Sequence, residues 1–233
     1  MKKTIKWLIV PVAACCASTA FATETGFYAG LGAGESHYKS WASASDARNL
    51  NEAYGASIGV DDFDGMAGSS TDQSAIGFKV FAGYALNHWL AVEASYLDAG
   101  EVDAGSTRTG TFYDPVDNSL TGTVSVGASA QTTAVTLDAL VGMPVGQIEV
   151  FGKAGVYSAQ TKLKLTGTSS IIDGDYRYSD RTDASGGHYG IGIRFAVKDA
   201  IGFRAEWERL YGVEANDAKS DVDLLSASLT YQF

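Results

Sequence analysis

Apolar and polar residues alternate with a period of two through the last thirteen residues, 221–233. Leu225, Ala227, Leu229, Tyr231 and Phe233 occupy one track, and small polar residues lie between them. This alternation is typical of a β-strand with one apolar and one polar face. Because the strand would end on an unprotected phenylalanine, we expect its apolar face to meet lipid rather than a soluble core.

Seven further stretches alternate in the same way, which predicts eight strands. Three short turns separate them in alternation with four long polar stretches, a pattern typical of outer-membrane barrels, whose short turns face the periplasm. The fold class predicted is therefore all-β, an eight-stranded antiparallel up-and-down transmembrane β-barrel. The further strands are expected at residues 27–34, 75–86, 90–96, 133–143, 148–157, 188–197 and 201–210, and extracellular loops at 36–74, 98–130, 160–187 and 211–220. Two segments of the second loop, 109–113 and 120–126, would extend their hairpin beyond the bilayer.

The N-terminal segment has the features of a secretory signal peptide. Three lysines precede an apolar run from Trp7 to Ala17, and Ala20-Phe21-Ala22 forms an A-x-A cleavage site. We expect cleavage after Ala22, leaving residues 23–233 as one barrel domain. Alternatively, residues 12–15 form a lipobox that would make Cys15 a lipidated N-terminus. Both cysteines, Cys15 and Cys16, precede Ala22, so the cleaved chain would have no disulfide.

The charge and hydropathy of the chain narrow the possible functions. The formal net charge is −10, and removal of the three signal-peptide lysines would lower it further. An acidic surface argues against nucleic-acid binding. The mean hydropathy is −0.01 and no run of about eighteen apolar residues occurs, which excludes helical membrane spans. A barrel remains compatible, because its apolar residues are spread over alternate positions.

Charged residues avoid the apolar tracks of the predicted strands. The first charged residue on those tracks is Arg209, at the outer end of its strand. This absence is expected of a lipid-facing track, because a charge that faces lipid at mid-depth costs about 2–4 kcal/mol. The opposite tracks, which we place in the barrel interior, carry four cations and four anions. This predicted lumen charge network comprises Lys79, Glu93, Asp138, Lys153, Arg194, Arg204, Glu206 and Glu208.

The turn lengths suggest how these charges pair. A four-residue turn at 144–147 would place Asp138 opposite Lys153, and the turn after 197 would place Arg194 opposite Arg204. Acid partners for the two guanidinium groups are expected from Glu206 and Glu93. Since the interior of an eight-stranded barrel is just wide enough for side chains, we predict a salt-bridged plug. The alternative is a gate in which one pair exchanges partners and small ions pass.

Aromatic residues gather at both ends of the predicted strands, as in the interface girdles of membrane barrels. Those at the short-turn ends are Tyr84, Phe195, Phe203, Tyr231 and Phe233, and those at the opposite ends are Tyr96, Tyr189 and Trp207.

Other candidate chemistry is weak. His37, His88 and His188 are far apart in the chain, and no histidine is expected to accompany the interior charges. His37 with Ser36 or Ser40 is a conceivable catalytic pair, but a lone loop histidine is ordinarily solvated. The acidic stretches 61–65 and 173–175 lack the spacing of a calcium loop, although weak divalent-cation binding there is an alternative. We expect no catalytic residue, no metal site and no cofactor.

Four stretches resemble the OmpA-type eight-stranded transmembrane domain of Gram-negative outer membranes, namely residues 26–30, 77–84, 203–209 and 221–233. The resemblance covers the chain after the signal peptide, except the long loops. It implies that the interior charges plug, and sometimes gate, the lumen, which carries over to Lys79, Glu93, Arg194, Arg204 and Glu206. It also implies that Leu229, Tyr231 and Phe233 form a signal read by the barrel-assembly machinery. No residue follows Phe233, so a peptidoglycan-binding domain is not expected.

The function expected first is a non-enzymatic integral outer-membrane protein with a structural, surface-exposed role. A small gated porin and an adhesin acting through the acidic loops are the alternatives. A lipid-modifying enzyme would need a His-Ser-acid set near the outer leaflet, and none is found. The partners expected are outer-membrane lipids and lipopolysaccharide, with the barrel-assembly machinery and periplasmic chaperones during biogenesis. No nucleic-acid partner is expected, and the sequence does not identify a surface ligand.

Overall fold

The computed structural model of the 233-residue chain describes residues 25–39, 41–62, 68–114, 118–170, 175–198, 200–215 and 218–233. The predicted signal peptide, with Cys15 and Cys16, lies outside the described residues. So do Ser40, Asp64 and Asp173, which belong to the loop motifs considered above.

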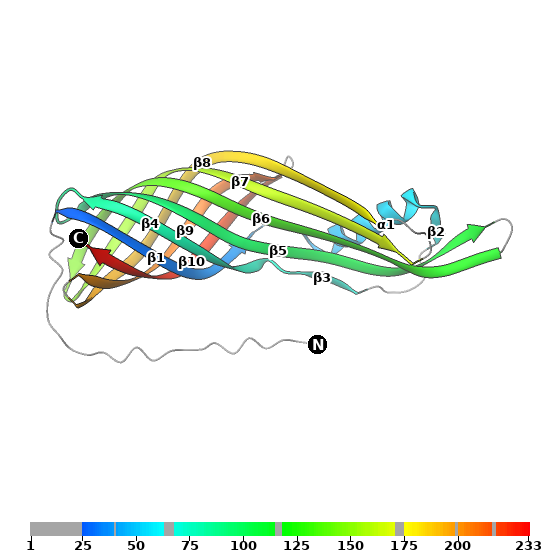
Figure 1. The fold of residues 1–233 in the computed structure, drawn as a ribbon, viewed down its shortest axis with the longest axis horizontal. Coiled ribbons are helices and arrows are strands. Elements are labelled where there is room, and N and C mark those ends of the chain that lie inside the picture. Colours follow the sequence, from blue (N-terminus) through cyan, green and yellow to red (C-terminus); the bar gives the residue numbers. More distant parts are fainter. Residues whose placement is uncertain are drawn as a thin grey trace.

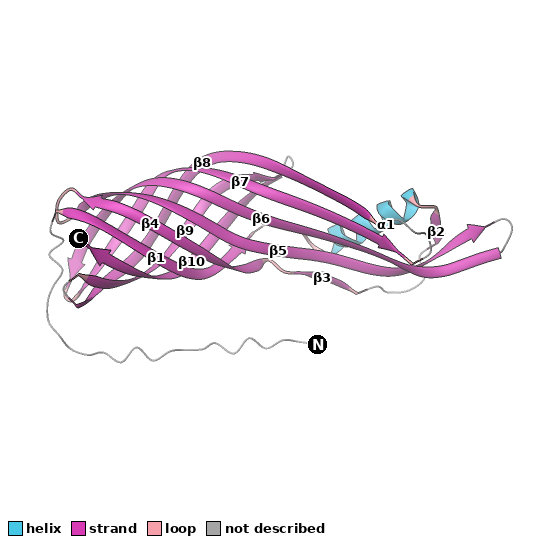
Figure 2. Ribbon diagram, in the orientation of Figure 1, coloured by secondary structure: helices cyan, strands magenta, loops and turns pink. Residues whose placement is uncertain are grey.

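The described chain consists of long antiparallel strands and one helix, shown in Figures 1 and 2. Eight strands, β1 and β4 to β10, form a closed ring, because β5 pairs with β6 as well as with β4. The predicted eight-stranded barrel is therefore confirmed. In chain order the elements are β1 (Gly26–Tyr38), α1 (Ala44–Ser57), β2 (Val60–Asp62), β3 (Ser69–Thr71), β4 (Ser74–Ala85), β5 (Leu90–Asp114), β6 (Asn118–Val145), β7 (Ile148–Ser169), β8 (Tyr176–Lys198), β9 (Ile201–Ala215) and β10 (Ala218–Gln232).

Strands β1 and β10 close the barrel by pairing along most of their length, from Tyr28 opposite Gln232 to Tyr38 opposite Val222. The backbone N–H of Phe233 donates a hydrogen bond of 2.9 Å to the carbonyl oxygen of Phe27. The beginning of β1 and the end of β10 therefore lie together at the end of the barrel that holds the short turns (Figure 1). We call this the short-turn end.

The turn between β6 and β7 is shorter than predicted. Val145 pairs with Ile148, so the turn has two residues, and Gly146 adopts a φ of 67° that favours glycine. The prediction of a four-residue turn, with Met143 opposite Ile148, is wrong. As a result Asp138 lies opposite Gly155, and Lys153 lies opposite Leu140. The other register prediction is confirmed, because Arg194 lies opposite Arg204.

Four strands continue past the barrel and form a sheet that we call the extension, which runs to the right in Figure 1. Pairing of β5 with β6 continues to Asp114 opposite Asn118, and pairing of β7 with β8 continues to Gly167 opposite Tyr176. The anticipated lengthening of the β5–β6 hairpin is confirmed. Most of residues 98–130, 160–187 and 211–220, predicted as loops, are instead strand. These strands pair through their backbones and bury only a few small apolar side chains, such as Val102, Val124 and Val126.

The predicted first loop, 36–74, contains helix α1 and the short strands β2 and β3. Ser43 caps the helix through a capping box with Asp46, and Gly59 follows its end with a φ of 81°. The buried side chain of Asn51 donates hydrogen bonds of 2.9 Å to the backbone carbonyls of Ser106 and Val124, which attaches the helix to the extension. The prediction of an irregular loop here is therefore wrong.

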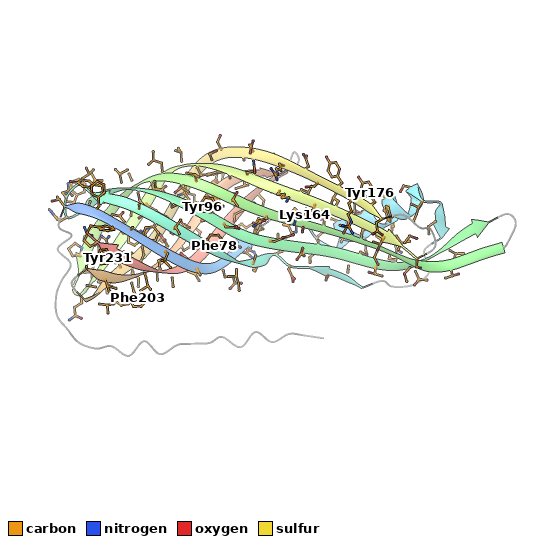
Figure 3. The ribbon with its side chains drawn as sticks, viewed as in Figure 1. Phe78, Tyr96, Lys164, Tyr176, Phe203 and Tyr231 are labelled. Carbon is orange, nitrogen blue, oxygen red and sulfur yellow. The ribbon has the colours of Figure 1, made fainter. Side chains whose placement is uncertain are left out.

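The outward face of the barrel is apolar and exposed. Ile76 is 84% exposed and Leu137 is 56% exposed, which a soluble fold would avoid. Figure 3 shows Phe203 and Tyr231 toward the short-turn end, Phe78 and Tyr96 farther along the barrel, and Lys164 and Tyr176 on the extension. No helix among the described residues is long and apolar enough to cross a membrane.

The aromatic side chains predicted as girdles are exposed or half-exposed on this outward face, and they contact other rings in pairs. At the short-turn end the pairs are Phe27 with Tyr84, Phe195 with Phe203, and Tyr231 with Phe233; farther along they are Phe78 with Tyr96 and Tyr189 with Trp207.

Candidate functional site in the barrel interior

The barrel interior contains a layer of buried charges, which we call the charged layer and which includes Arg204 on β9. Its guanidinium carbon lies 4.7 Å from the ring centroid of Phe81 and 4.4 Å from that of Phe151. It donates hydrogen bonds to both carboxylate oxygens of Glu93, at 2.5 and 3.1 Å, and forms a second ion pair with Glu206. The guanidinium group is thus stacked on two rings and paired with two carboxylates.

Two lysines from opposite parts of the ring meet the same two glutamates. Lys79 on β4 forms ion pairs with Glu206 and, at 3.0 Å, with Glu208. Lys153 on β7 forms ion pairs with Glu208 and, at 3.2 Å, with Glu206. All four side chains are at most 1% exposed. These contacts cross the lumen and connect β4, β7 and β9, although none of these strands pairs with another of the three.

His188 on β8 also belongs to this layer. Its Nδ1 atom lies 2.7 Å from Oδ1 of Asp138, and its Nε2 atom lies 3.2 Å from Oε2 of Glu208 without a well-aligned hydrogen bond. The other oxygen of Asp138 accepts a 2.7 Å hydrogen bond from the hydroxyl of Thr136. The side chain of His188 is fully buried. The expectation that no histidine accompanies the interior charges is therefore wrong.

A separate ion pair lies nearer the short-turn end. Arg194 donates hydrogen bonds of 2.7 and 2.8 Å to the two carboxylate oxygens of Glu149. The hydroxyl of Tyr28 donates a 3.0 Å hydrogen bond to Glu93, and the Arg194 guanidinium lies 5.8 Å from the ring of Tyr28. Tyr28 thus lies between this pair and the charged layer.

The structure brings most of the eight predicted lumen charges together, but not always with the predicted partners. Arg204 contacts Glu93 and Glu206, as expected from the sequence. Arg194 pairs with Glu149 instead, a residue on the interior track that was left out of the predicted network. Asp138 and Lys153 form no ion pair among the described contacts, because the shorter turn changes the register.

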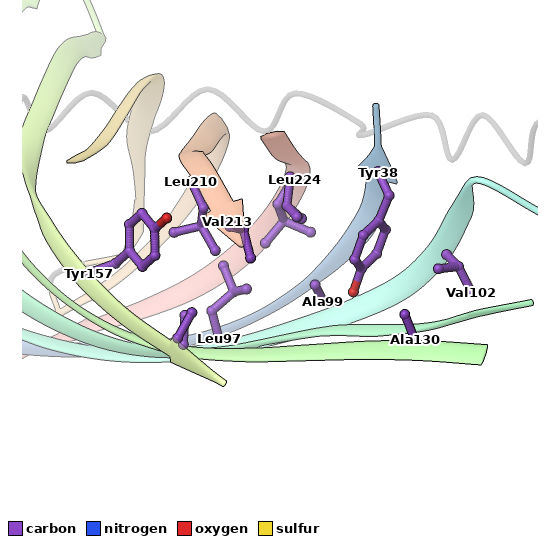
Figure 4. Packing of buried hydrophobic residues seen from close by; sticks show 12 residues of the cluster. Tyr38, Leu97, Ala99, Val102, Ala130, Tyr157, Leu210, Val213 and Leu224 are labelled. Carbon is purple, nitrogen blue, oxygen red and sulfur yellow. The ribbon is translucent and has the colours of Figure 1, made fainter. Parts of the chain in front are cut away.

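Apolar clusters lie on both sides of the charged layer. Toward the extension, the cluster shown in Figure 4 includes Tyr38, Leu97, Tyr157, Leu210 and Leu224, all buried. Toward the short-turn end, a second cluster includes Tyr28, Phe81, Leu140 and Phe151. We call these the outer and inner apolar layers. At the short-turn mouth, beside Glu149 and Arg194, two cavities measure only about 20 and 10 Å³, at most the room of one water molecule each.

The other predicted candidates do not assemble into a reactive site. His37 is exposed and contacts the hydroxyl of Ser74, whereas Ser36 is buried and faces the interior; His88 is exposed in a turn. In the described part of the chain, no group of three or more His, Cys, Asp or Glu residues is arranged to hold a metal ion. Among the described residues, the interior side chains thus form ion pairs and hydrogen bonds with one another.

A closed barrel with an apolar outward face and paired charges inside is characteristic of outer-membrane proteins. Residues 8–233 match the model of the outer membrane protein beta-barrel domain family, and the chain belongs to this family. It is accordingly a protein of the Gram-negative outer membrane. A search of curated proteins finds no match.

The solved structures similar to this chain are distant from it in sequence. Neisserial surface protein A is 14% identical, with a TM-score of 0.51 over 89% of this chain and 97% of that one. Ail, the attachment invasion locus protein of Yersinia pestis, was solved in complex with the heparin analogue sucrose octasulfate. It is 16% identical, with a TM-score of 0.47 over 90% of this chain and 99% of that one. OprG from Pseudomonas aeruginosa is 13% identical, with a TM-score of 0.42 over 91% of this chain and 98% of that one.

Proposed function

We propose that the protein is a sealed, non-catalytic outer-membrane barrel with a structural and surface-exposed role. The observation that supports this most directly is the succession of buried layers across the lumen. A permeating ion would have to displace the outer apolar layer, then the ion pairs, then the inner apolar layer. Either apolar layer alone opposes a hydrated ion, because its tyrosine hydroxyls already have hydrogen-bond partners and its other side chains have no polar group to replace the ion's water.

The charged layer adds rigidity to this seal. A buried charge that loses its partner costs roughly 3–5 kcal/mol, so exchange of partners in the lumen is costly unless another opposite charge is within reach. Glu206 contacts Lys79, Lys153 and Arg204 at once. In the narrow-porin alternative, the lumen would open when the Glu206 carboxylate shifts from one of these cations to another.

Single-channel recording in planar bilayers tests the proposal. We expect no conductance from the refolded wild type, from Lys79→Ala or from Glu206→Ala, because the apolar layers remain in place. Lys164→Ala, on the exposed extension, is the matched control. A positive control combines three substitutions, Leu97→Ala and Leu224→Ala in the outer apolar layer and Lys79→Ala in the charged layer. We expect this variant to conduct, which would show that the assay can detect an open lumen. Discrete wild-type openings that Lys79→Ala prolongs would contradict the seal and establish the narrow porin.

A second candidate, surface recognition, is favoured by the extension. This region is an ordered sheet with a helix attached through Asn51 and through an ion pair of Glu52 with Arg108, rather than a set of irregular loops. A rigid surface of this kind suits binding of an external partner. Replacing residues 44–57 by a short Gly-Ser linker should abolish adhesion of expressing bacteria to cultured host cells, with barrel folding unchanged. Unchanged adhesion would contradict this role.

The partners proposed follow from the outward face and from biogenesis. Outer-membrane lipids and lipopolysaccharide would cover the exposed apolar band between the two sets of aromatic pairs. Periplasmic chaperones and the barrel-assembly machinery would handle the chain before insertion, with Leu229, Tyr231 and Phe233 as the assembly signal.

A further inference from the structure

The charged layer is electrically neutral only if His188 is counted as a cation. Three cations, Lys79, Lys153 and Arg204, face four carboxylates, those of Glu93, Asp138, Glu206 and Glu208. The pair of Arg194 and Glu149 is neutral by itself. With a neutral His188, the layer would therefore carry one uncompensated negative charge in the fully buried part of the lumen, which is costly.

The surroundings of the His188 ring indicate the same charge state. The ring nitrogens face Asp138 on β6 and Glu208 on β9, and the third charged group near the ring is Lys153 on β7. A neutral imidazole has one N–H and one lone pair. A neutral ring protonated on Nε2 would point a lone pair at the Asp138 carboxylate at 2.7 Å, and one protonated on Nδ1 would leave a lone pair 3.2 Å from Glu208. The imidazolium instead donates to Asp138 and carries a positive charge beside Glu208.

The two carboxylates are poor alternative places for this proton. Asp138 already accepts a hydrogen bond from Thr136, and the hydroxyl of Thr136 is 2.7 Å from that of Ser95. Glu208 already forms ion pairs with Lys79 and Lys153. The oxygens of both carboxylates therefore already have hydrogen-bond donors or cations as partners, which a proton bound there would displace.

We propose that His188 is a proton-dependent lock of the barrel interior. As an imidazolium it joins Asp138 to Glu208, and thereby links β6, β8 and β9 within the charged layer. Its stabilising contribution is complete while the proton is held and is lost when rising pH removes it, because the layer then carries an unbalanced charge. The inference deepens the sealed-lumen proposal, but its readouts are protonation and stability, so either proposal can fail without the other.

The charge state can be measured directly by nitrogen NMR of the full chain, labelled with ¹⁵N-histidine and refolded in detergent micelles. His188→Gln identifies the signals of His188, and the exposed His37 and His88 serve as internal references. At pH 7 we expect both His188 nitrogens at imidazolium shifts. Signals of a neutral tautomer at pH 7 would overturn the proposal.

A charge-restoring pair of variants tests the role in stability. His188→Gln alone and Asp138→Asn alone each unbalance the layer, and we expect each to lower the unfolding temperature by roughly 10 °C at pH 7. The double variant restores neutrality and should recover more than half of the loss. The wild type should lose stability at alkaline pH, and His188→Gln should not. A double variant no more stable than His188→Gln would mean that His188 acts by packing alone and would overturn the proposal.

Discussion

Arg204 shows how one residue combines several interactions that are weak at the surface and strong in a dry lumen. Its guanidinium group lies between the rings of Phe81 and Phe151 and pairs with Glu93 and Glu206. The planar group can stack and donate at its edge at the same time, which a lysine cannot do. Arginine is therefore suited to the boundary between the charged layer and the inner apolar layer.

Replacing Arg204 by methionine should lower the free energy of unfolding by about 3–5 kcal/mol, because Glu93 loses its main cation while it stays buried. Urea unfolding of the refolded protein in lipid vesicles measures this loss. Arg194→Met, which affects a partly exposed pair at the short-turn mouth, is the matched control and should cost less. Adding Glu93→Gln to Arg204→Met should recover part of the loss. Equal losses of unfolding free energy in Arg204→Met and Arg194→Met would contradict the view that burial makes the Arg204 ion pairs stronger.

At the scale of residues, the sequence predicted which side chains face inward but not all of their partners. Alternation determines the face of a strand, so Lys79, Glu93 and Arg204 could be placed in the lumen. Pairing depends on register, and register depends on turn length. The predicted turn was two residues too long, which misplaced Asp138 against Lys153. His188 was expected as the first residue of its strand, at the base of the third loop, and was therefore not counted with the interior charges.

Helix α1 is the element that depends most on a local feature, its capping box. Ser43 donates hydrogen bonds from its backbone N–H and its hydroxyl to the carboxylate of Asp46, at 2.8 and 2.6 Å, and these bonds hold the pKa of Asp46 below its usual value of 3.8. A carboxylate at this position also interacts favourably with the helix dipole. The helix is therefore stabilised by the charged form of Asp46.

This gives the pH dependence of α1 a definite sign. Because the pKa of Asp46 is lower in the folded state, its contribution is complete above about pH 3.8 and is lost as the pH falls through the folded value. We expect the hydrogen-exchange protection factors of α1 to fall in this acidic range. They should not fall there in Asp46→Asn. If the protection of α1 still falls in acid in Asp46→Asn, a group other than Asp46 causes the pH dependence.

At the scale of elements, the barrel strands could be predicted, whereas the extension and α1 could not be predicted in full. A strand against lipid needs an apolar track, which is visible in the sequence. Strands of the extension bury only short apolar residues such as Val124 and Val126, scattered among polar ones and glycines, so no sustained apolar track marks them in the sequence. In α1 the residue that anchors the helix is the polar Asn51, and this interrupts the apolar stripe by which an amphipathic helix is recognised.

For the whole molecule, barrel closure joins the first and last strands of the ring. Tyr231 and Phe233 lie on the outward face of β10, with ring centroids 5.0 Å apart, and the Phe233 N–H binds the Phe27 carbonyl. Nothing inside the lumen requires these two rings. Their exposure is compatible with recognition by another protein before the barrel closes.

From the proposed role of these rings as the assembly signal, we predict that Phe233→Ala and Tyr231→Ala reduce the amount of folded barrel in the outer membrane of growing cells. Refolding of the same variants from urea into detergent should be nearly normal, since no packed interior contact is lost. Leu225→Ala, on the same face of β10, is the control and should assemble normally. Equal defects in cells and in detergent would show that the rings act through stability instead.

The continuity of β5 to β8 from the barrel wall into the extension has a mechanical consequence. A partner pulling on the far end of the extension would load the hydrogen-bonded ladders along the strand direction, so that many bonds resist shear together instead of opening one after another. The same strands continue into the closed ring, where each is paired on both sides. Force applied at the cell surface would thus pass into the membrane-embedded wall without crossing a flexible joint in these four strands, and the extension would bear tension as a part of the barrel itself.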